Sequence, residues 1–226
     1  MQAVILAAGR GKRMKHLTNS QPKPMLQVNG LPILEYKIRI LPKTIEEIIF
    51  IIGYCGEHIM NHFGKSFEGR PIRYVFQTRL NGTGGAVHLA KSLIKDRFLV
   101  MMGDDLYHKR DVKSMLKYDL AVLAKEDDNP SNFGVLKTNR RGYLIDIVEK
   151  PKQPKERLVN TAMYVLNKKF FNYELVPIGN GEYGLPQTLA VMAAEHPVKV
   201  VKATFWHPIT SSGDLEKAEE IIHKLY

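Results

Sequence analysis

Short runs of β-favouring apolar residues alternate with segments of helical periodicity through the first half of this chain. Strands that are apolar along their whole length are buried on both faces, and intervening helices act as crossovers between parallel strands. The pattern therefore predicts an α/β fold around a parallel sheet. The expected strands are Ala3–Ala8, Ile48–Ile52, Ile72–Phe76 and Phe98–Met102, and the expected helices are Ile33–Leu41, Glu57–Phe63 and Gly84–Lys95.

The second half has a different pattern, with strands joined by turn-rich connections, so the sheet is expected to become mixed. Right-handed crossovers in the first half give a Rossmann-like, doubly wound arrangement that places ligands at the carboxyl ends of the strands. No internal repeat is present, and residues 1–226 suit a single domain. The pattern changes after Leu120–Ala124, and further strands are expected at Phe133–Leu136, Tyr143–Val148, Thr161–Leu166 and Val198–Phe205, with helices at Gln187–Glu195 and Asp214–Leu225.

Composition restricts the compartment and the partners. Cys55 is the only cysteine, no apolar run reaches the roughly 18 residues of a membrane span, and the N-terminus carries no basic leader pattern. We therefore expect a cytoplasmic protein without membrane partners, with Cys55 as a partly buried small residue. The net charge of +10 suits small polyanions, but it is spread along the chain and accompanies no nucleic-acid-reading motif.

A glycine-rich, basic loop follows the first strand, in the segment Leu6-Ala7-Ala8-Gly9-Arg10-Gly11-Lys12-Arg13-Met14. Small residues after a buried strand let backbone N–H groups approach an anion closely. Met14 stands where a dinucleotide fingerprint requires its third glycine, and the Gly-Lys-Ser/Thr of a Walker A loop is absent. The segment therefore suits a triphosphate, and the alternative is a glycine-rich turn with a solvated basic face.

This loop, together with Leu17-Thr18 and Pro22-Lys23-Pro24, resembles the signature of the sugar-1-phosphate nucleotidyltransferase family, which includes glucose-1-phosphate thymidylyltransferases and uridylyltransferases. The resemblance implies a fold of the nucleotide-diphospho-sugar transferase type. It also implies a nucleotide-binding half at about 1–125 and a sugar-phosphate-binding half at about 126–226. In such enzymes the residue at Arg13 contacts the triphosphate and that at Lys23 neutralises charge in the transition state. His16 replaces the proline usual before Leu-Thr.

Two further motifs in the first half match the family, Gln77-Thr78-Arg79-Leu80-Asn81-Gly82-Thr83-Gly84-Gly85-Ala86 and Met101-Met102-Gly103-Asp104-Asp105. The resemblance assigns Gln77 to the base edge, Asp104 to Mg²⁺ as the metal ligand, and Asp105 to the side facing the substrate. Because successive strand residues point to opposite faces, we expect only one of the two aspartates to enter the site. The implied catalytic residues are Arg13, Lys23 and Asp104, and the implied nucleotide-binding residues are Leu6, Ala8, Gly9, Gly11, Arg13, Lys23, Gln77, Gly82 and Thr83.

Weaker matches in the second half resemble the family's sugar-phosphate side. They are Phe133-Gly134-Val135, Glu149-Lys150-Pro151 and Val159-Asn160-Thr161, in the family's order. The implied sugar-phosphate-binding residues are Asp105, Gly134, Glu149, Lys150 and Asn160.

The C-terminal motif departs from the family pattern. The usual Trp-x-Asp/Asn is Trp206-His207-Pro208 here, so a proline occupies the position of a second metal-ligand carboxylate. His207 is a poor Mg²⁺ ligand, and we expect it to be structural or solvent-exposed. We expect Asp214 to cap the last helix. The usual Leu-Thr-Asp is likewise altered, to Leu185-Pro186-Gln187.

These observations predict Mg²⁺-dependent transfer of a nucleoside monophosphate from a nucleoside triphosphate (NTP) to a sugar 1-phosphate. The Gln77 amide can donate and accept hydrogen bonds together, which favours UTP or dTTP. The alternative, motivated by Pro208, is a catalytically degenerate sensor or regulatory subunit that binds nucleotide-sugars. Assembly as a homo-oligomer is compatible with either function.

Overall fold

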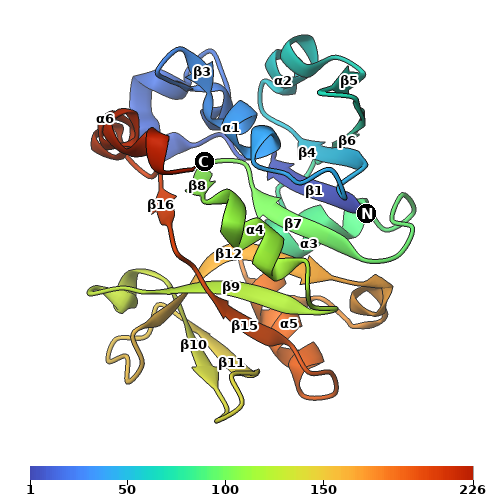
Figure 1. Ribbon diagram of the computed structural model, residues 1–226, viewed down its shortest axis with the longest axis vertical. Helices are drawn as coiled ribbons and strands as arrows, with labels where there is room; N and C mark the ends of the chain where they lie inside the picture. Colours follow the sequence, from blue (N-terminus) through green and yellow to red (C-terminus); the bar gives the residue numbers. More distant parts are fainter. Residues whose placement is uncertain (226) are drawn as a thin grey trace.

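The structure, a computed structural model, describes residues 1–225 and is built on one mixed sheet (Figure 1). Its parallel part has β1 (Gln2–Ala7) at the centre, β4 (Glu47–Ile52) on one side and β7 (Phe98–Met102) on the other. Beyond β4 lies β6 (Arg70–Phe76), also parallel. These are the four buried strands predicted from the sequence, and three of them begin one or two residues earlier.

Antiparallel strands extend the sheet beyond β7. The long strand β12 (Leu158–Leu166) pairs with β7 through its second half and with β10 (Gly134–Thr138) only at Val159. A register shift between Asn160 and Tyr164 interrupts its pairing with β9. The predicted mixed sheet is therefore confirmed. Strands β7 and β10 pair with opposite ends of β12. The other strands of this part are β9 (Ala121–Glu126), β11 (Leu144–Glu149) and β15 (Lys199–Lys202).

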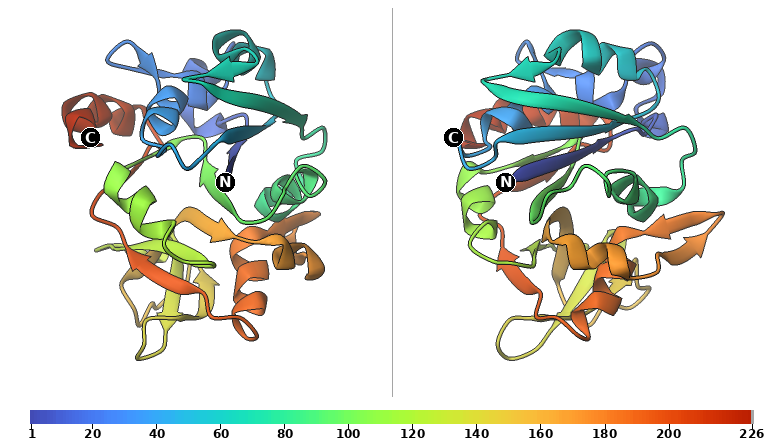
Figure 2. Two further views of the ribbon diagram at one scale, coloured as in Figure 1. Left: turned by 45° about the vertical axis from the view of Figure 1, so that its right-hand side comes forward. Right: turned by 90° about the vertical axis from the view of Figure 1, so that its right-hand side faces the viewer.

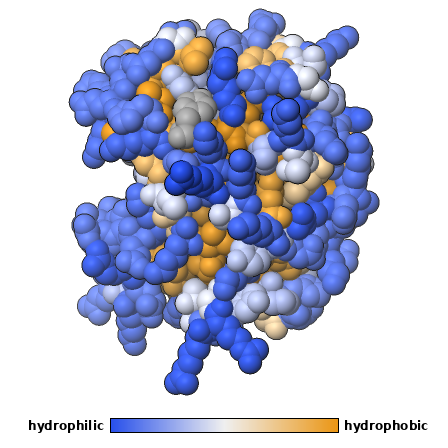
Figure 3. All heavy atoms as spheres, viewed as in Figure 1, coloured by the Kyte–Doolittle hydropathy of each residue, from blue (hydrophilic) through white to orange (hydrophobic). Residues whose placement is uncertain are grey.

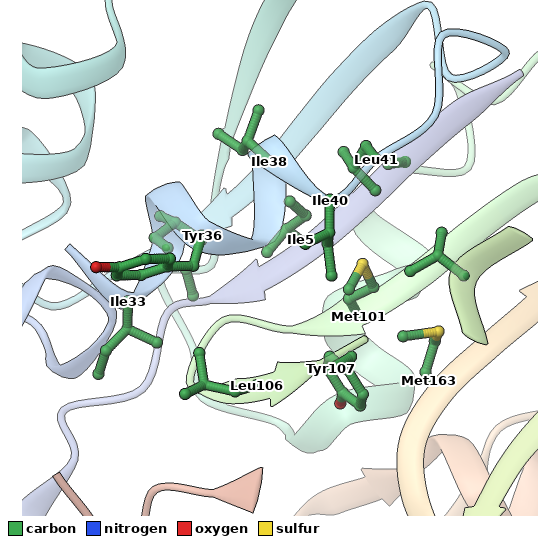
Figure 4. Close-up of a cluster of buried hydrophobic side chains, with 14 of the residues drawn as sticks. Ile5, Ile33, Tyr36, Ile38, Ile40, Leu41, Met101, Leu106, Tyr107 and Met163 are labelled. Atoms are coloured by element: carbon green, nitrogen blue, oxygen red, sulfur yellow. The ribbon is translucent and has the colours of Figure 1, made fainter. Parts of the chain in front are cut away.

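Helices cover both faces of the sheet (Figure 2). Successive side chains of β1 point to opposite faces of the sheet, which explains this layering. Ile5 packs in one buried cluster and Leu6 in the other. Figure 4 shows part of the first cluster, with Ile5 beneath side chains of α1. The first cluster takes in α1 (Ile33–Arg39), α2 (Gly56–Phe63), α4 (Lys109–Met115) and α6 (Ser212–Ile221), and the second takes in α3 (Gly82–Leu89) and α5 (Leu185–Ala193).

Several elements differ from the predicted ones or carry no clear pattern. Helix α3 ends at Leu89 rather than Lys95, and the strand expected at Val198–Phe205 covers only Lys199–Lys202. The unpredicted elements are helix α4, strands β2 (Gln27–Val28), β3 (Leu31–Pro32), β5 (Ser66–Phe67), β8 (Asp105–Tyr107), β13 (Val176–Gly179), β14 (Glu182–Gly184) and β16 (Trp206–Pro208), and 3-10 helices at Lys12–Thr18, Lys23–Met25, Pro130–Asn132, Lys168–Asn172 and Ile222–Leu225. Within residues 1–225 no helix is both long and apolar enough to cross a membrane.

The last helix begins with a capping box. Ser211 Oγ accepts a hydrogen bond from the backbone N–H of Asp214, and the Asp214 carboxylate accepts one from the backbone N–H of Ser211. This satisfies two of the backbone donors that a helix start leaves unpaired. The predicted capping role of Asp214 is confirmed.

A buried aspartate on α4 fixes the connection between β15 and β16. The Asp111 carboxylate, 2% exposed, accepts hydrogen bonds from the backbone N–H groups of Thr204 and Phe205 and from the Thr204 hydroxyl. Because Trp206 follows directly, this carboxylate fixes the chain just before β16, which pairs with β8 in a separate two-stranded sheet.

We predict that Asp111→Ala destabilises the fold by about 1–3 kcal/mol, because two backbone N–H groups and a hydroxyl lose the buried carboxylate that accepts their hydrogen bonds. Asp128→Ala removes an exposed carboxylate paired with Arg157 and is the matched control. Its expected effect is below about 0.5 kcal/mol. Urea unfolding of the three proteins measures both values, and equal midpoints for the two variants would contradict the role given to Asp111.

Candidate active site

A cleft of about 780 Å³ lies where the parallel strands end, between the parallel and antiparallel parts of the sheet. Figure 3 shows the molecule hollowed on the left of the view, between its upper and lower halves. Two smaller hollows adjoin the cleft, and each shares lining residues with it. All the sequence-predicted site residues line one or more of these three spaces: Leu6, Ala8, Gly9, Gly11, Arg13, Lys23, Gln77, Gly82, Thr83, Asp104, Asp105, Gly134, Glu149, Lys150 and Asn160.

The first hollow, about 290 Å³, has Gln77 in its wall directly after β6. The side chain is 7% exposed, and its Nε2 donates to Asn81 Oδ1 at 3.0 Å and to the Gly82 carbonyl at 3.3 Å. Both donors are thus used inside the protein, so Oε1 is the atom that remains to accept from a ligand. The hollow offers a hydrogen-bond acceptor in largely apolar surroundings.

Gly82 begins α3 beside this hollow with φ +86°. A Cβ there would lie 2.4 Å from the backbone oxygen of Tyr183, so only glycine fits. Tyr183 belongs to the hairpin β13–β14, whose Ile178 and Glu182 line the cleft. Sequence reasoning missed these two residues, although the turn Gly179-Asn180-Gly181 between two β-favouring segments is a typical hairpin signal.

The second hollow, about 310 Å³, is formed by the basic loop. Gly11 has φ +67°, and a Cβ there would lie 2.8 Å from Lys23 Cβ, so glycine lets the loop pack against Lys23. Arg13 lines both this hollow and the main cleft. Lys23 Nζ lies 2.6 Å from Asp104 Oδ2, with the lysine side chain 8% exposed and the aspartate side chain 28% exposed. The arrangement places cations around a space large enough for phosphate groups.

Asp104 and Asp105 both line the main cleft, so the expectation that only one of them enters the site was wrong. The physical reason is that β7 ends at Met102 and a turn follows, so the alternation of a continuous strand does not extend to these residues. Asp105 Oδ2 accepts a hydrogen bond from Trp206 Nε1 at 3.0 Å. Burial, and then the neighbouring charge of Asp104, raises the pKa of Asp105 to about 6.

Strand β16 closes this part of the cleft by pairing antiparallel to β8. The register sets Pro208 opposite Asp105, so the backbone reaches the position expected for a further ligand but carries no carboxylate. His207 is buried, and its Nε2 donates to the backbone oxygen of Asp214 at 2.8 Å. The prediction of a structural His207 is confirmed.

The donor set of the acidic turn fits a magnesium ion that arrives with phosphates. Within the described residues no group of three or more His, Cys, Asp or Glu side chains is placed to hold a metal by itself. Asp104 and Asp105 nevertheless offer hard carboxylate oxygens, and Mg²⁺ is commonly bound by one or two carboxylates with substrate phosphates and water. The site is therefore suited to a metal–triphosphate complex and is not a closed metal cage.

The opposite wall of the cleft comes from the antiparallel part. Gly134 and Glu149 pair across β10 and β11, and a Cβ on Gly134 would lie 2.9 Å from Glu149 Oε2. Asn160 Nδ2 donates to the Tyr164 hydroxyl at 2.6 Å, which fixes its orientation. Lys150 follows Glu149 into the same space. This wall therefore presents a carboxylate, an amide and a cation, a set that suits hydroxyl groups and a phosphate.

The first residues of α5 complete the cleft, and sequence reasoning did not assign them to the site. Leu185, Pro186 and Gln187 line it, and the backbone N–H of Leu185 donates to Thr83 Oγ1 at 3.1 Å. This bond ties α5 to the start of α3. Leu185-Pro186-Gln187, which replaces the family's usual Leu-Thr-Asp, therefore lies in the wall of the cleft.

Comparison with known proteins agrees with this geometry. Residues 2–224 match the family model described as nucleotidyl transferase. The bifunctional protein GlmU of Methanococcus aeolicus is 38% identical over 99% of this chain and 55% of its own length. The UTP–glucose-1-phosphate uridylyltransferase AglF of Haloferax volcanii is 32% identical over 97% of this chain and 96% of its own length. The chain spans about half the length of the GlmU relatives it matches.

Solved structures show the same fold. A Bacillus anthracis protein described as a glucose-1-phosphate thymidylyltransferase, in complex with a sucrose, superposes with a TM-score of 0.89 at 25% identity, covering 100% of this chain and 96% of that one. A UDP-glucose pyrophosphorylase complexed with UDP-glucose, at 22% identity and a TM-score of 0.86, agrees in fold. The resemblance to sugar-1-phosphate nucleotidyltransferases is confirmed, and the chain belongs to the nucleotidyl transferase family.

Proposed function

We propose that this protein transfers a nucleoside monophosphate from an NTP to a sugar 1-phosphate, with Mg²⁺, and releases pyrophosphate. The observation that carries the proposal is the continuity of the cleft. It joins an acceptor in an apolar hollow, a group of cations with an acidic turn, and a wall suited to hydroxyls and a phosphate. A nucleoside triphosphate and a sugar phosphate need these three environments in this order.

The reaction is an in-line displacement at the α-phosphorus. An oxygen of the sugar phosphate forms the new P–O bond, the bond to the β-phosphate oxygen breaks, and pyrophosphate leaves with that electron pair. Arg13 and Lys23 bind the triphosphate and neutralise charge, and Lys150 orients the incoming phosphate. Mg²⁺, held by Asp104 and Asp105, would neutralise further phosphate charge when bound. No covalent enzyme intermediate is required.

The base is proposed to be uracil or thymine. Gln77 Nε2 is bonded inside the protein, so Oε1 is oriented to accept, and the N3–H of a pyrimidine-2,4-dione is a donor. The names of two similar proteins, a UTP–glucose-1-phosphate uridylyltransferase and a glucose-1-phosphate thymidylyltransferase, point the same way. UTP and dTTP are therefore the first nucleotides to test, with glucose 1-phosphate as the first acceptor.

One observation favours a second candidate function. Pro208 lies opposite Asp105 and supplies no side-chain ligand for a metal. A protein that binds nucleotide-sugars without making them would tolerate the loss of this ligand. Such a sensor would bind UDP-glucose or a similar compound and release no pyrophosphate.

Pyrophosphate release, screened over five NTPs and a panel of sugar 1-phosphates with phosphocholine, separates the two functions. We expect Mg²⁺-dependent release with UTP or dTTP and one sugar 1-phosphate. Folded protein that binds a nucleotide-sugar and releases no pyrophosphate with any pair would support the sensor instead.

Two charge-removing variants test the assigned roles. Lys23→Met and Asp104→Asn each remove one partner of the ion pair, and we expect kcat to fall roughly 10²–10⁴-fold because transition-state charge is no longer neutralised. Lys155→Met and Asp128→Asn, at exposed positions away from the cleft, are matched controls that should retain the wild-type rate. Near-normal kcat in both site variants would contradict the assignment.

Base selection is tested at Gln77. Gln77→Met keeps the length of the side chain and removes the acceptor, so we expect kcat/KM for UTP or dTTP to fall about tenfold. Discrimination against ATP should weaken in parallel. Gln153→Met, in an exposed loop, is the control. Unchanged nucleotide preference in Gln77→Met, measured by competition between UTP and ATP, would remove Gln77 from base recognition.

A further inference from the structure

Helix α1 carries a lysine that is buried behind the acidic turn. Lys37 is 1% exposed, and its Nζ has no hydrogen-bond partner among residues 1–225. The ammonium lies 4.5 Å from the ring centroid of Tyr107, a residue of β8 within the buried cluster of Figure 4. Lysine is almost never fully buried unless its charge is compensated, so this position requires an electrostatic explanation.

The compensating charges are the two aspartates of the cleft. Helix α1 packs against β8, whose first residue is Asp105. Lys37 Nζ lies over the ring of Tyr107, and the Tyr107 hydroxyl lies 3.5 Å from Asp105 Oδ2, so the ammonium stands behind the acidic turn. Burial lowers the pKa of Lys37 to about 8, and the charges of Asp105 and Asp104 oppose this lowering. Lys23, which is paired to Asp104, and Lys37 supply two positive charges against the two carboxylates. Pro208 supplies no further carboxylate.

The two lysines differ in what they can do when a ligand enters. Lys23 lines the cleft, so its Nζ is able to turn from Asp104 to a phosphate oxygen. Lys37 lies behind the cleft wall in the core. Its Nζ therefore stays in the core behind the acidic turn and does not line the space that a nucleotide would enter.

We propose that Lys37 controls the metal affinity of the acidic turn. Its fixed positive charge behind Asp104 and Asp105 keeps a divalent cation from binding the free protein, so that the metal enters together with the triphosphate. Triphosphate oxygens supply the negative charge that the neutral cluster lacks, and Lys23 moves to them. The proposal rests on the proposed function for the identity of that triphosphate.

Direct binding of Mn²⁺ to nucleotide-free protein tests this at pH 7.5, with free Mn²⁺ measured by electron paramagnetic resonance. Mn²⁺ prefers the same oxygen ligands as Mg²⁺. We expect weak binding to the wild type and at least about tenfold tighter binding to Lys37→Met, because removal of a nearby like charge strengthens attraction for a divalent ion.

Lys199→Met is the matched control, because Lys199 also lies over a tyrosine ring, that of Tyr143, and is not among the residues that line the cleft. Equal Mn²⁺ affinity of Lys37→Met and the wild type would overturn the proposal, and so would equal tightening in Lys199→Met. Thermal unfolding checks that Lys37→Met is folded, and Lys37→Gln replaces it if it is not.

These outcomes are independent of turnover. Absence of pyrophosphate release with every substrate pair would refute the proposed function, whereas tighter Mn²⁺ binding by Lys37→Met alone would still support the charge effect. Normal turnover with unchanged Mn²⁺ affinity in Lys37→Met would refute only the role of Lys37.

Discussion

The ion pair between Lys23 and Asp104 is the interaction on which the site depends. It joins the segment Pro22-Lys23-Pro24, against which the basic loop packs, to the turn after β7, and the two residues are 81 positions apart in the chain. Because both side chains are partly or largely buried, their attraction is stronger than that of a surface pair. The pair also holds Lys23 and Asp104 together at the place where a bound triphosphate and a bound metal would separate them.

The mixed sheet explains why one domain can hold two substrates. Parallel strands bring loops to one edge, where the nucleotide-facing residues gather. Strand β12 then changes partner along its length, and the antiparallel strands beyond it turn a second set of side chains toward the same edge. The cleft is thus a consequence of topology, and Asp111 and the capping box of α6 hold the closing strand β16 in place.

Local signals predicted much of this arrangement. Continuous apolar runs located the buried strands within one or two residues, and glycines beside cations located the phosphate-facing loop. The pairing of β8 with β16 was missed because its strands have three residues each and join distant segments. The resemblance assigned Asp105 to the site correctly, but the expectation that only one of the two aspartates enters it failed because strand alternation stops at the turn after β7. Lys37 lies within a helix predicted from its apolar residues, and nothing local marks its charge as buried.

A crystal structure of the protein with Mg²⁺ and UDP-glucose tests the central claim most directly. The account predicts the base against Gln77, the sugar against Glu149 and Asn160, and Lys23 Nζ on a phosphate oxygen and no longer on Asp104. A ligand bound in the cleft with the Lys23–Asp104 pair intact, or a nucleotide-sugar bound outside the cleft, would contradict it.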